Sequence, residues 1–234
     1  MVQQNNLLAV VLTLTWVLVF LIFSEILAHM NRLSKENARK LIHIAVGNVI
    51  FFIPFYEDRW LAALVPFLFV FGNYLLYPYS PIEKMRLQTF QAGHSFGTIY
   101  YPFSLSIVVF VFFSHPQLIL ASFFPVVYGD GLAAVFGPRS QSRRFYVWSG
   151  EKSTNGTLAM FFASFISVLL GSVILSTYID SPIKFASIIV FSILVSVIGT
   201  LVELFSPKGM DNLTIPLVLM IMLQIIATLD YIQI

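Results

Sequence analysis

The sequence has no cysteine, and charged residues make up only 10% of its 234 residues. The absence of cysteine excludes disulfides, thiolate nucleophiles and metal sites built on thiolates. Ordinary globular domains carry roughly 25% charged residues, whereas this chain is 58% hydrophobic. The composition therefore indicates a polytopic membrane protein, and we expect residues 1–234 to form a single integral-membrane domain without a soluble domain.

Eight long apolar stretches divide the chain. They cover residues 7–28, 41–56, 60–77, 97–114, 116–136, 156–178, 183–205 and 213–229. A transmembrane helix needs about 17–25 apolar residues, so the second stretch is marginal in length. The strict alternation of apolar and polar residues that is typical of a membrane barrel is missing from the sequence. We therefore predict an all-α bundle of about eight transmembrane helices.

The basic residues lie almost entirely in alternate connections between these stretches. With eight spans, Arg59 and Lys184 fall on one side, which leaves eleven of the thirteen Lys and Arg residues on the other. Cytoplasmic loops are enriched in Lys and Arg, so we predict that the side with eleven is cytoplasmic. Both the N-terminus and the C-terminus are then expected on the outer side.

A carboxylate between two glycines interrupts the fifth stretch, where Asp130 follows Gly129 and precedes Gly131. Glycine breaks helices and lets the backbone approach a ligand closely. A carboxylate can share Mg²⁺ with phosphate oxygens. An acid that reaches from a helix end to water is the alternative. Because an ionisable group is costly in a membrane, we predict that Asp130 is a catalytic residue and a metal ligand and that both glycines contact a nucleotide.

A second polar segment, residues 151–157, precedes the sixth stretch. The start of a helix offers free N–H groups and a positive dipole end to an anion, and a lysine adds a point charge for phosphate. The alternative is a capped helix with a basic residue at the inner membrane face. The Gly-x4-Gly-Lys spacing of a P-loop is missing, which argues against a P-loop kinase. We predict a catalytic role for Lys152 and nucleotide contacts for Arg139, Ser153, Gly156 and Thr157.

A third polar group lies between the last two stretches, where Glu203 ends one and Asp211 and Asn212 begin the other. Asp and Asn at this position also cap a helix well, which is the structural alternative. Sites that handle triphosphates use one or two carboxylates with water. We predict Asp211 and Glu203 as further metal ligands and Asn212 as a nucleotide contact.

Two histidines lie near the start of apolar stretches on the same predicted side. His43 follows Arg39 and Lys40 into the second stretch, and His94 precedes the fourth. Polar groups inside a membrane usually face the bundle interior, where a histidine could accept a proton. We predict catalytic roles for both histidines and nucleotide contacts for Arg39 and Lys40. Alternatively, Arg39 and Lys40 only follow the general enrichment of basic residues on the cytoplasmic side, and His94 lies on the surface.

Five short motifs occur in one order. They are Arg39-Lys40-x-x-His43, Gly93-His94-x-x-Gly97-Thr98, Gly129-Asp130-Gly131-x-Ala133, Lys152-Ser153-x-x-Gly156-Thr157 and Asp211-Asn212-x-x-x-Pro216. This order resembles the phytol kinase/dolichol kinase family of integral-membrane polyprenol kinases, over about residues 39–216. That family is related to CTP-dependent diacylglycerol kinase and, more distantly, to phosphatidate cytidylyltransferase. The resemblance implies Mg²⁺-dependent transfer of phosphate from a nucleoside triphosphate, often CTP, to a long-chain isoprenoid alcohol.

Two positions depart from the pattern of that family. Asn155 stands where the pattern Lys-Ser-x-Glu-Gly has an acid, and Met210 replaces the first acid of Asp-Asp-Asn. The loss of two carboxylates implies fewer metal ions, a different phosphate donor or weaker activity.

The sequence therefore predicts a membrane lipid kinase whose active site lies at the cytoplasmic face. We expect Mg²⁺ as cofactor, CTP or ATP as donor, phytol, geranylgeraniol or a dolichol as acceptor, and no nucleic acid partner. A cytidylyltransferase that makes a CDP-lipid is the nearest alternative. A transporter is a further one, although transporters place ionisable groups near the membrane midplane in repeated halves, and no repeat is visible here. The oligomeric state stays open.

Overall fold

The computed structural model describes residues 3–76, 96–137, 142–179, 184–207 and 209–228. Its helices are α1 (Asn6–His29), α2 (Lys35–Gly47), α3 (Arg59–Leu76), α5 (Gly97–Phe112), α6 (Pro116–Phe124), α7 (Gly131–Phe136), α8 (Thr154–Ile179), α9 (Phe185–Phe205) and α10 (Asp211–Thr228). A 3₁₀ segment, η1 (Asn48–Phe55), follows α2, and a π-helical segment, η3 (Pro125–Asp130), joins α6 to α7. Two short strands, β1 (Arg144–Val147) and β2 (Gly150–Ser153), precede α8.

The predicted all-α membrane bundle is confirmed, and each of the eight apolar stretches holds a helix. Within the described residues, seven helical segments are long and apolar enough to cross a membrane. α2 with η1 forms one of them, and α6, η3 and α7 together form another. The remaining stretch holds α5, which has 16 residues. At 1.5 Å per residue α5 is about 24 Å long, which is shorter than the hydrocarbon core of about 30 Å.

Polar side chains define where three of the helices begin in this apolar sequence. Asn5, Ser34 and Asp58 each accept a hydrogen bond from the backbone N–H three residues further on, at 2.9, 3.2 and 3.1 Å. These N–H groups lack a partner within the helix, so the side chain satisfies them and fixes the helix start.

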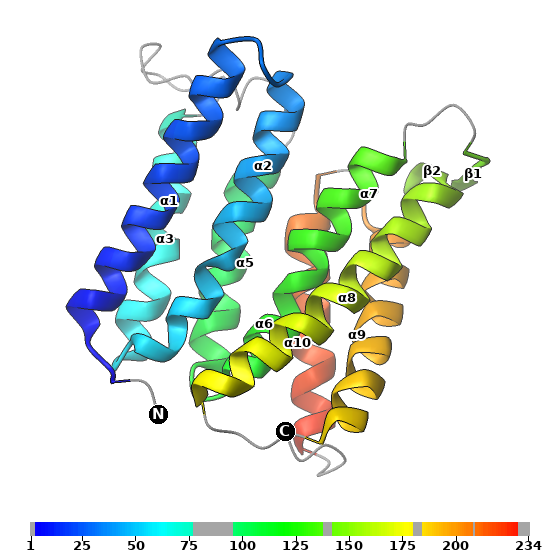
Figure 1. The fold of residues 1–234 in the computed structure, drawn as a ribbon. Helices are drawn as coiled ribbons and strands as arrows, with labels where there is room; N and C mark the ends of the chain where they lie inside the picture. Colours follow the sequence, from blue (N-terminus) through cyan, green and yellow to red (C-terminus); the bar gives the residue numbers. More distant parts are fainter. Residues whose placement is uncertain (1–2, 77–95, 138–141, 180–183, 208, 229–234) are drawn as a thin grey trace.

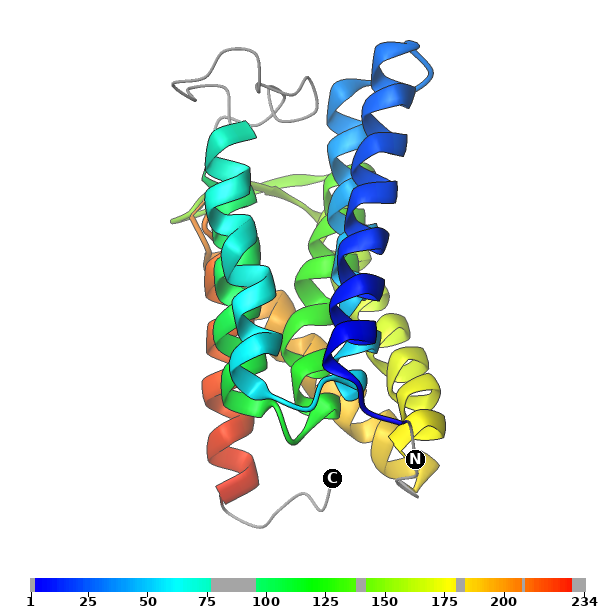
Figure 2. The same cartoon turned by 90° about the vertical axis from the view of Figure 1, so that its left-hand side faces the viewer.

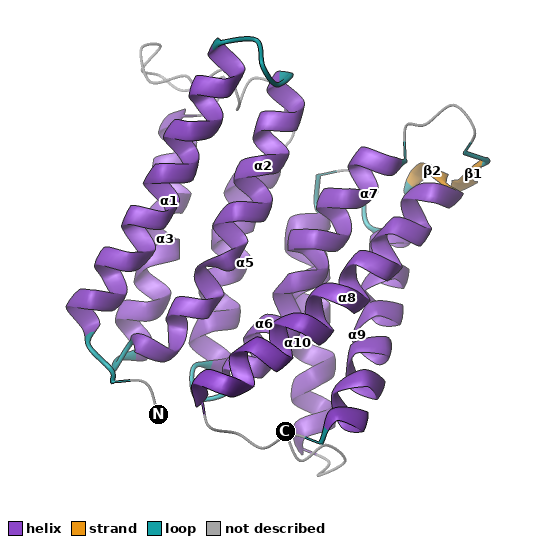
Figure 3. Ribbon diagram, in the orientation of Figure 1, coloured by secondary structure: helices purple, strands orange, loops and turns teal. Residues whose placement is uncertain are grey.

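The segment between β1 and β2 is a hairpin that the sequence did not predict. Arg144 pairs with Ser153 and Val147 with Gly150 in an antiparallel register. Gly150 has a φ of 126°, a conformation that glycine adopts without steric strain. In the described part of the chain these are the only strands, as Figure 3 makes visible against the surrounding helices.

The helices run between two ends of an elongated bundle. The hairpin and the connection between α1 and α2 lie at one end, which we call the hairpin end, whereas α1 begins and α10 ends at the opposite end (Figures 1 and 2). Arg59 and Lys184 lie at that opposite end, where α3 and α9 begin. The described cations of the hairpin end are Arg32, Lys35, Arg39, Lys40, Arg143, Arg144 and Lys152. The side of the membrane that each end faces stays a prediction.

Among the seven apolar segments long enough to cross a membrane in the described part of the chain, the one formed by α6, η3 and α7 is the most buried. The expectation that Gly129 and Gly131 break this helix is wrong, because the helical backbone continues through both to Phe136. The two glycines instead permit close helix packing. A Cβ on Gly129 would lie 3.0 Å from the Met160 carbonyl oxygen of α8, and a Cβ on Gly131 would lie 3.0 Å from Ile44 of α2.

Replacing Gly129 by alanine is expected to destabilise the protein by about 1–3 kcal/mol, because the added methyl group overpacks the contact with α8. The measurement is the melting temperature in detergent micelles. Gly72→Ala is the matched control, since a Cβ at Gly72 meets no atom within 4 Å. Because alanine stabilises a helix by about 0.5–1 kcal/mol relative to glycine, this variant should melt at or above the wild-type temperature. A Gly129→Ala protein that melts at or above the wild-type temperature would contradict the tight packing.

Candidate functional site

Five charged residues from five elements converge towards the hairpin end. The charges of Arg39, Lys152, Glu203 and Asp211 all act on the carboxylate of Asp130, and those of Arg39 and Lys152 also act on Asp211. These side chains come from α2, η3, β2, α9 and α10. We call them the charged cluster. The sequence predicted all five as site residues, and the fold brings them together from positions that are up to 172 residues apart, between 39 and 211.

The packing of η3 and α7 fixes the direction in which Asp130 points. Gly129 faces α8 and Gly131 faces α2. Successive residues of a helix are rotated by about 100° about its axis. Asp130 therefore projects between these two contacts, towards the acids at the end of α9 and the start of α10.

Lys152 and Glu203 form an ion pair within the cluster. The Lys152 ammonium donates to the Glu203 carboxylate at 2.5 Å and to the Glu203 backbone carbonyl at 2.8 Å. Next to this pair, the Ser149 hydroxyl donates to the carbonyl of Leu204 at 2.6 Å. These contacts hold the hairpin against the C-terminal end of α9.

The ion pair changes the predicted metal site. In the described ranges no three His, Asp or Glu residues lie close enough together to hold a metal ion, so the predicted trio of Asp130, Asp211 and Glu203 does not form. Glu203 turns to Lys152 instead. Mg²⁺ is usually held by one or two carboxylates together with water and substrate phosphates. Asp130 and Asp211 fit that donor set.

Asp211 and Asn212 also have structural partners at the start of α10. The Asp211 carboxylate accepts the backbone N–H of Asn212 at 2.9 Å. The Asn212 side-chain amide donates to the carbonyl of Gly97 at 3.0 Å, which ties α10 to the start of α5. The carbonyl oxygen of the same amide is buried and has no hydrogen-bond partner.

Lys40 joins two helices. Its ammonium donates to the carbonyl of Ala134 in α7 at 2.8 Å and lies 3.3 Å from the carboxylate of Glu36. Only 8% of the residue is exposed. The predicted nucleotide contact of Lys40 stays a prediction, whereas its neighbour Arg39 belongs to the charged cluster.

The start of α8 differs from the expected anion site. The N–H groups of its first three residues donate to the carbonyl of Arg143 and to the hydroxyls of Ser142 and Ser153, at 2.9, 3.1 and 3.2 Å. The expectation of free amides is therefore wrong for these three groups. The Thr157 hydroxyl donates to the Ser153 carbonyl at 3.1 Å, and Gly156 packs closely on Gly137. Nucleotide contacts from Ser153, Gly156 and Thr157 stay predictions.

The ring of His43 has a fixed orientation. Its Nε2 lies 2.9 Å from the carbonyl oxygen of Val126. A carbonyl can only accept, so Nε2 carries the hydrogen and Nδ1 keeps a free lone pair. The ring packs against Tyr101 with 4.3 Å between the ring centroids, and the Tyr101 hydroxyl donates to the His43 carbonyl at 2.8 Å.

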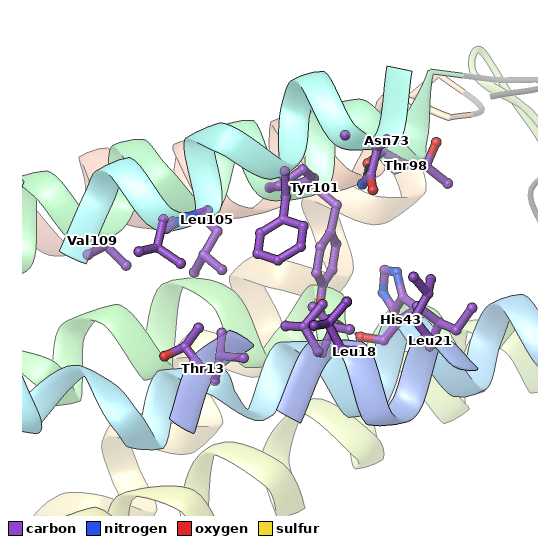
Figure 4. Close-up of a pocket in the computed structure, with 18 of the residues that line it drawn as sticks. Thr13, Leu18, Leu21, His43, Asn73, Thr98, Tyr101, Leu105 and Val109 are labelled. Atoms are coloured by element: carbon purple, nitrogen blue, oxygen red, sulfur yellow. Dashed lines mark hydrogen bonds between the residues drawn. The ribbon is translucent and has the colours of Figure 1, made fainter. Parts of the chain in front are cut away.

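A cavity of about 230 Å³ lies between α1, α2 with η1, α3 and α5. Most of its lining is apolar, but Arg39, His43, Asn73, Thr98 and Asn212 line its end near the charged cluster. Figure 4 shows His43, Asn73 and Thr98 at that end, with Thr13 and Val109 at the other. Arg39 therefore belongs both to the cavity wall and to the charged cluster.

Sequence reasoning missed part of this arrangement. An amide in the apolar stretch 60–77 was a usable signal for Asn73, because buried polar groups in membrane helices usually have a role. Tyr101 gave no signal among the ten tyrosines and 24 phenylalanines of the chain. His94 and Arg139 lie outside the described residues, so their roles stay predictions.

A comparison with known proteins agrees with the family that the sequence motifs resemble. No protein-family model matches the chain, and no solved structure matches it. The chain is 31% identical over 225 residues to a protein named phytol kinase from Synechocystis sp.. The match covers 92% of this chain and 93% of that protein, so it extends over nearly the full length of both. On this similarity, the chain belongs to the phytol kinase family of polyprenol kinases.

Proposed function

We propose that this protein is a membrane lipid kinase that transfers the γ-phosphate of a nucleoside triphosphate to the hydroxyl of a long-chain isoprenoid alcohol. CTP is the favoured donor, and phytol, geranylgeraniol or a dolichol is the acceptor. The observation that carries the proposal is the position of Arg39, where an apolar cavity meets the charged cluster. A water-soluble phosphate donor and a lipid alcohol require these two environments side by side.

The charged cluster suits the binding of a triphosphate. Asp130 and Asp211 would hold Mg²⁺, which when bound neutralises charge on the phosphates. Arg39 and Lys152 add positive charge next to these acids. Phosphoryl transfer depends mainly on positioning and on such charge stabilisation.

The transfer step needs a base for the alcohol proton. In the proposed reaction the alcohol oxygen attacks the γ-phosphorus, and the bond from this phosphorus to the β–γ bridging oxygen breaks. The products are the lipid phosphate and a nucleoside diphosphate. The Nδ1 atom of His43 accepts the alcohol proton, since the Val126 carbonyl holds the hydrogen on Nε2. Arg39, at the junction of cavity and cluster, would stabilise the transferring group.

The proposed location of the active site is the cytoplasmic face. The described cations gather at the hairpin end, where the charged cluster also lies. Lys and Arg are enriched in cytoplasmic connections, and nucleoside triphosphates are supplied from that side. The substrate alcohol would reach the same level from within the bilayer.

The test of the function is phosphate transfer by the purified protein in detergent micelles. CTP and ATP, each labelled at the γ-position, are offered separately with Mg²⁺ to phytol, geranylgeraniol, a dolichol and diacylglycerol. We expect label in an isoprenoid phosphate, with CTP the better donor. Release of pyrophosphate with formation of a CDP-lipid from phosphatidate would support a cytidylyltransferase instead. A folded protein that yields neither product would overturn both.

Asp130→Asn is expected to lower turnover by about 10²–10³-fold, because it removes one of the two carboxylates that would hold Mg²⁺ on the phosphates. It should also raise the Mg²⁺ concentration at which activity is half-maximal. Glu151→Gln is the matched control, since Glu151 lies at the same end but pairs with Arg144 on the surface. Full turnover by a folded Asp130→Asn protein would show that this carboxylate has no part in the reaction.

His43→Gln is expected to lower kcat by about 10²–10⁴-fold, the usual contribution of general base catalysis. Glutamine can still donate to the Val126 carbonyl, so the local hydrogen bond is preserved while the basic nitrogen is lost. Initial rates over a range of nucleotide concentrations separate kcat from KM, and KM for the nucleotide should change little. Unchanged kcat would place the base elsewhere.

A further inference from the structure

The cavity has the shape of a long slot rather than of a compact chamber. One face of α3 lines it, with residues spaced three or four apart: Ala62, Val65, Pro66, Phe69, Gly72, Asn73 and Leu76. At 1.5 Å per residue this lining extends about 21 Å along the helix axis. That length is most of the hydrocarbon thickness of a membrane, which is about 30 Å.

The end of the cavity near the charged cluster contains polar atoms without partners. Arg39 Nε, Thr98 Oγ1 and Asn212 Oδ1 are buried and form no hydrogen bond. Leaving such a group unsatisfied costs about 1–3 kcal/mol. Nε can only donate, Oδ1 can only accept, and a hydroxyl does both. The set therefore matches a ligand whose head group is an alcohol.

The far end of the cavity offers no free polar group among the residues that line it. Tyr56 and Thr13 are both buried there, and the Tyr56 hydroxyl donates to Thr13 Oγ1 at 3.0 Å. Ala62, which is 1% exposed, and Val109, which is fully buried, complete this end. An apolar cavity without free polar groups does not hold ordered water and suits a hydrocarbon. The asymmetry fixes the direction of a bound alcohol, with its hydroxyl towards the charged cluster.

We propose that this cavity holds the isoprenoid tail of the alcohol and that the end formed by Tyr56, Ala62 and Val109 sets the longest tail accepted. The inference rests on the proposed kinase function and adds to it the site of the tail. A slot lined along one face of α3 suits one prenyl chain better than the two acyl chains of a glycerolipid. Isoprenoid alcohols with more units than the slot accommodates are then poor substrates.

The test compares geraniol, farnesol and geranylgeraniol, which carry two, three and four isoprene units. Ala62→Phe fills the far end, so kcat/KM for geranylgeraniol is expected to fall by about 10–200-fold, the range for a misfit in an apolar pocket. Geraniol does not reach this end and should be used as well as by the wild type. Ala186→Phe is the matched control, because Ala186 is exposed on α9 and makes the same change in volume outside the cavity.

A second variant tests the cavity nearer to the hydroxyl. Gly72 lines the slot next to Asn73, and a Cβ at this position meets no atom within 4 Å. Gly72→Leu is therefore expected to fold and to lower kcat/KM for all three alcohols, since each must pass this position. The contrast between a length-dependent loss at Ala62 and a general loss at Gly72 is specific to a tail lying along α3.

The outcomes separate the tail site from the kinase function. If the wild type phosphorylates none of the alcohols with either nucleotide, the kinase function itself fails. If the wild type is active and a folded Ala62→Phe protein treats all three alcohols alike, the tail site is overturned and the kinase stands. If Ala62→Phe does not fold, Gly72→Leu decides, and unchanged use of all three alcohols by that variant would also overturn the tail site.

Discussion

The close packing of the η3–α7 segment between α2 and α8 determines where the charged residues meet. Helices approach this closely only where a side chain is missing, and here Gly129 and Gly131 supply the two gaps on opposite sides. The residue between them, Asp130, is thereby held at a fixed position in the charged cluster. A segment that could slide or rotate would carry this carboxylate away from Asp211. The two glycines thus fix the position of Asp130 by permitting close helix packing, independently of any contact with a ligand.

The balance of charge in the cluster explains why it suits a metal and a triphosphate. The cluster contains three acids and two cations and therefore carries a net negative charge. The ammonium of Lys152 is already paired with the Glu203 carboxylate. Asp130 and Asp211 then repel each other across a region of low dielectric, and a divalent cation would relieve this repulsion. At the two positions where the resemblance implied acids, this chain has Asn155 and Met210, so these positions add no negative charge. The absence of acids there is compatible with a site built on two acids.

The sequence predicted the helices well because hydropathy and length decide which segments cross a membrane. It also predicted the members of the charged cluster, because ionisable residues in an apolar chain are costly and each one carries information. It could not predict which way a side chain points around its helix. Two adjacent residues illustrate this limit. Lys40 donates to the Ala134 carbonyl, whereas Arg39, one position earlier, belongs to the charged cluster. The pairing of Lys152 with Glu203, the capped start of α8 and the cavity along α3 all depend on contacts between distant segments.

The cavity along α3 has a further consequence if it binds the tail as proposed. An isoprenoid alcohol and its phosphate carry the same tail, so the apolar wall between Ala62 and Leu76 cannot distinguish substrate from product. Tail contacts that are equally strong in the bound substrate, the transition state and the bound product raise affinity without raising kcat. Product inhibition should then grow with tail length, and only the groups around Arg39 and Asp211 can favour departure of the charged product. Release, rather than phosphate transfer, would limit turnover for the tails that fit best.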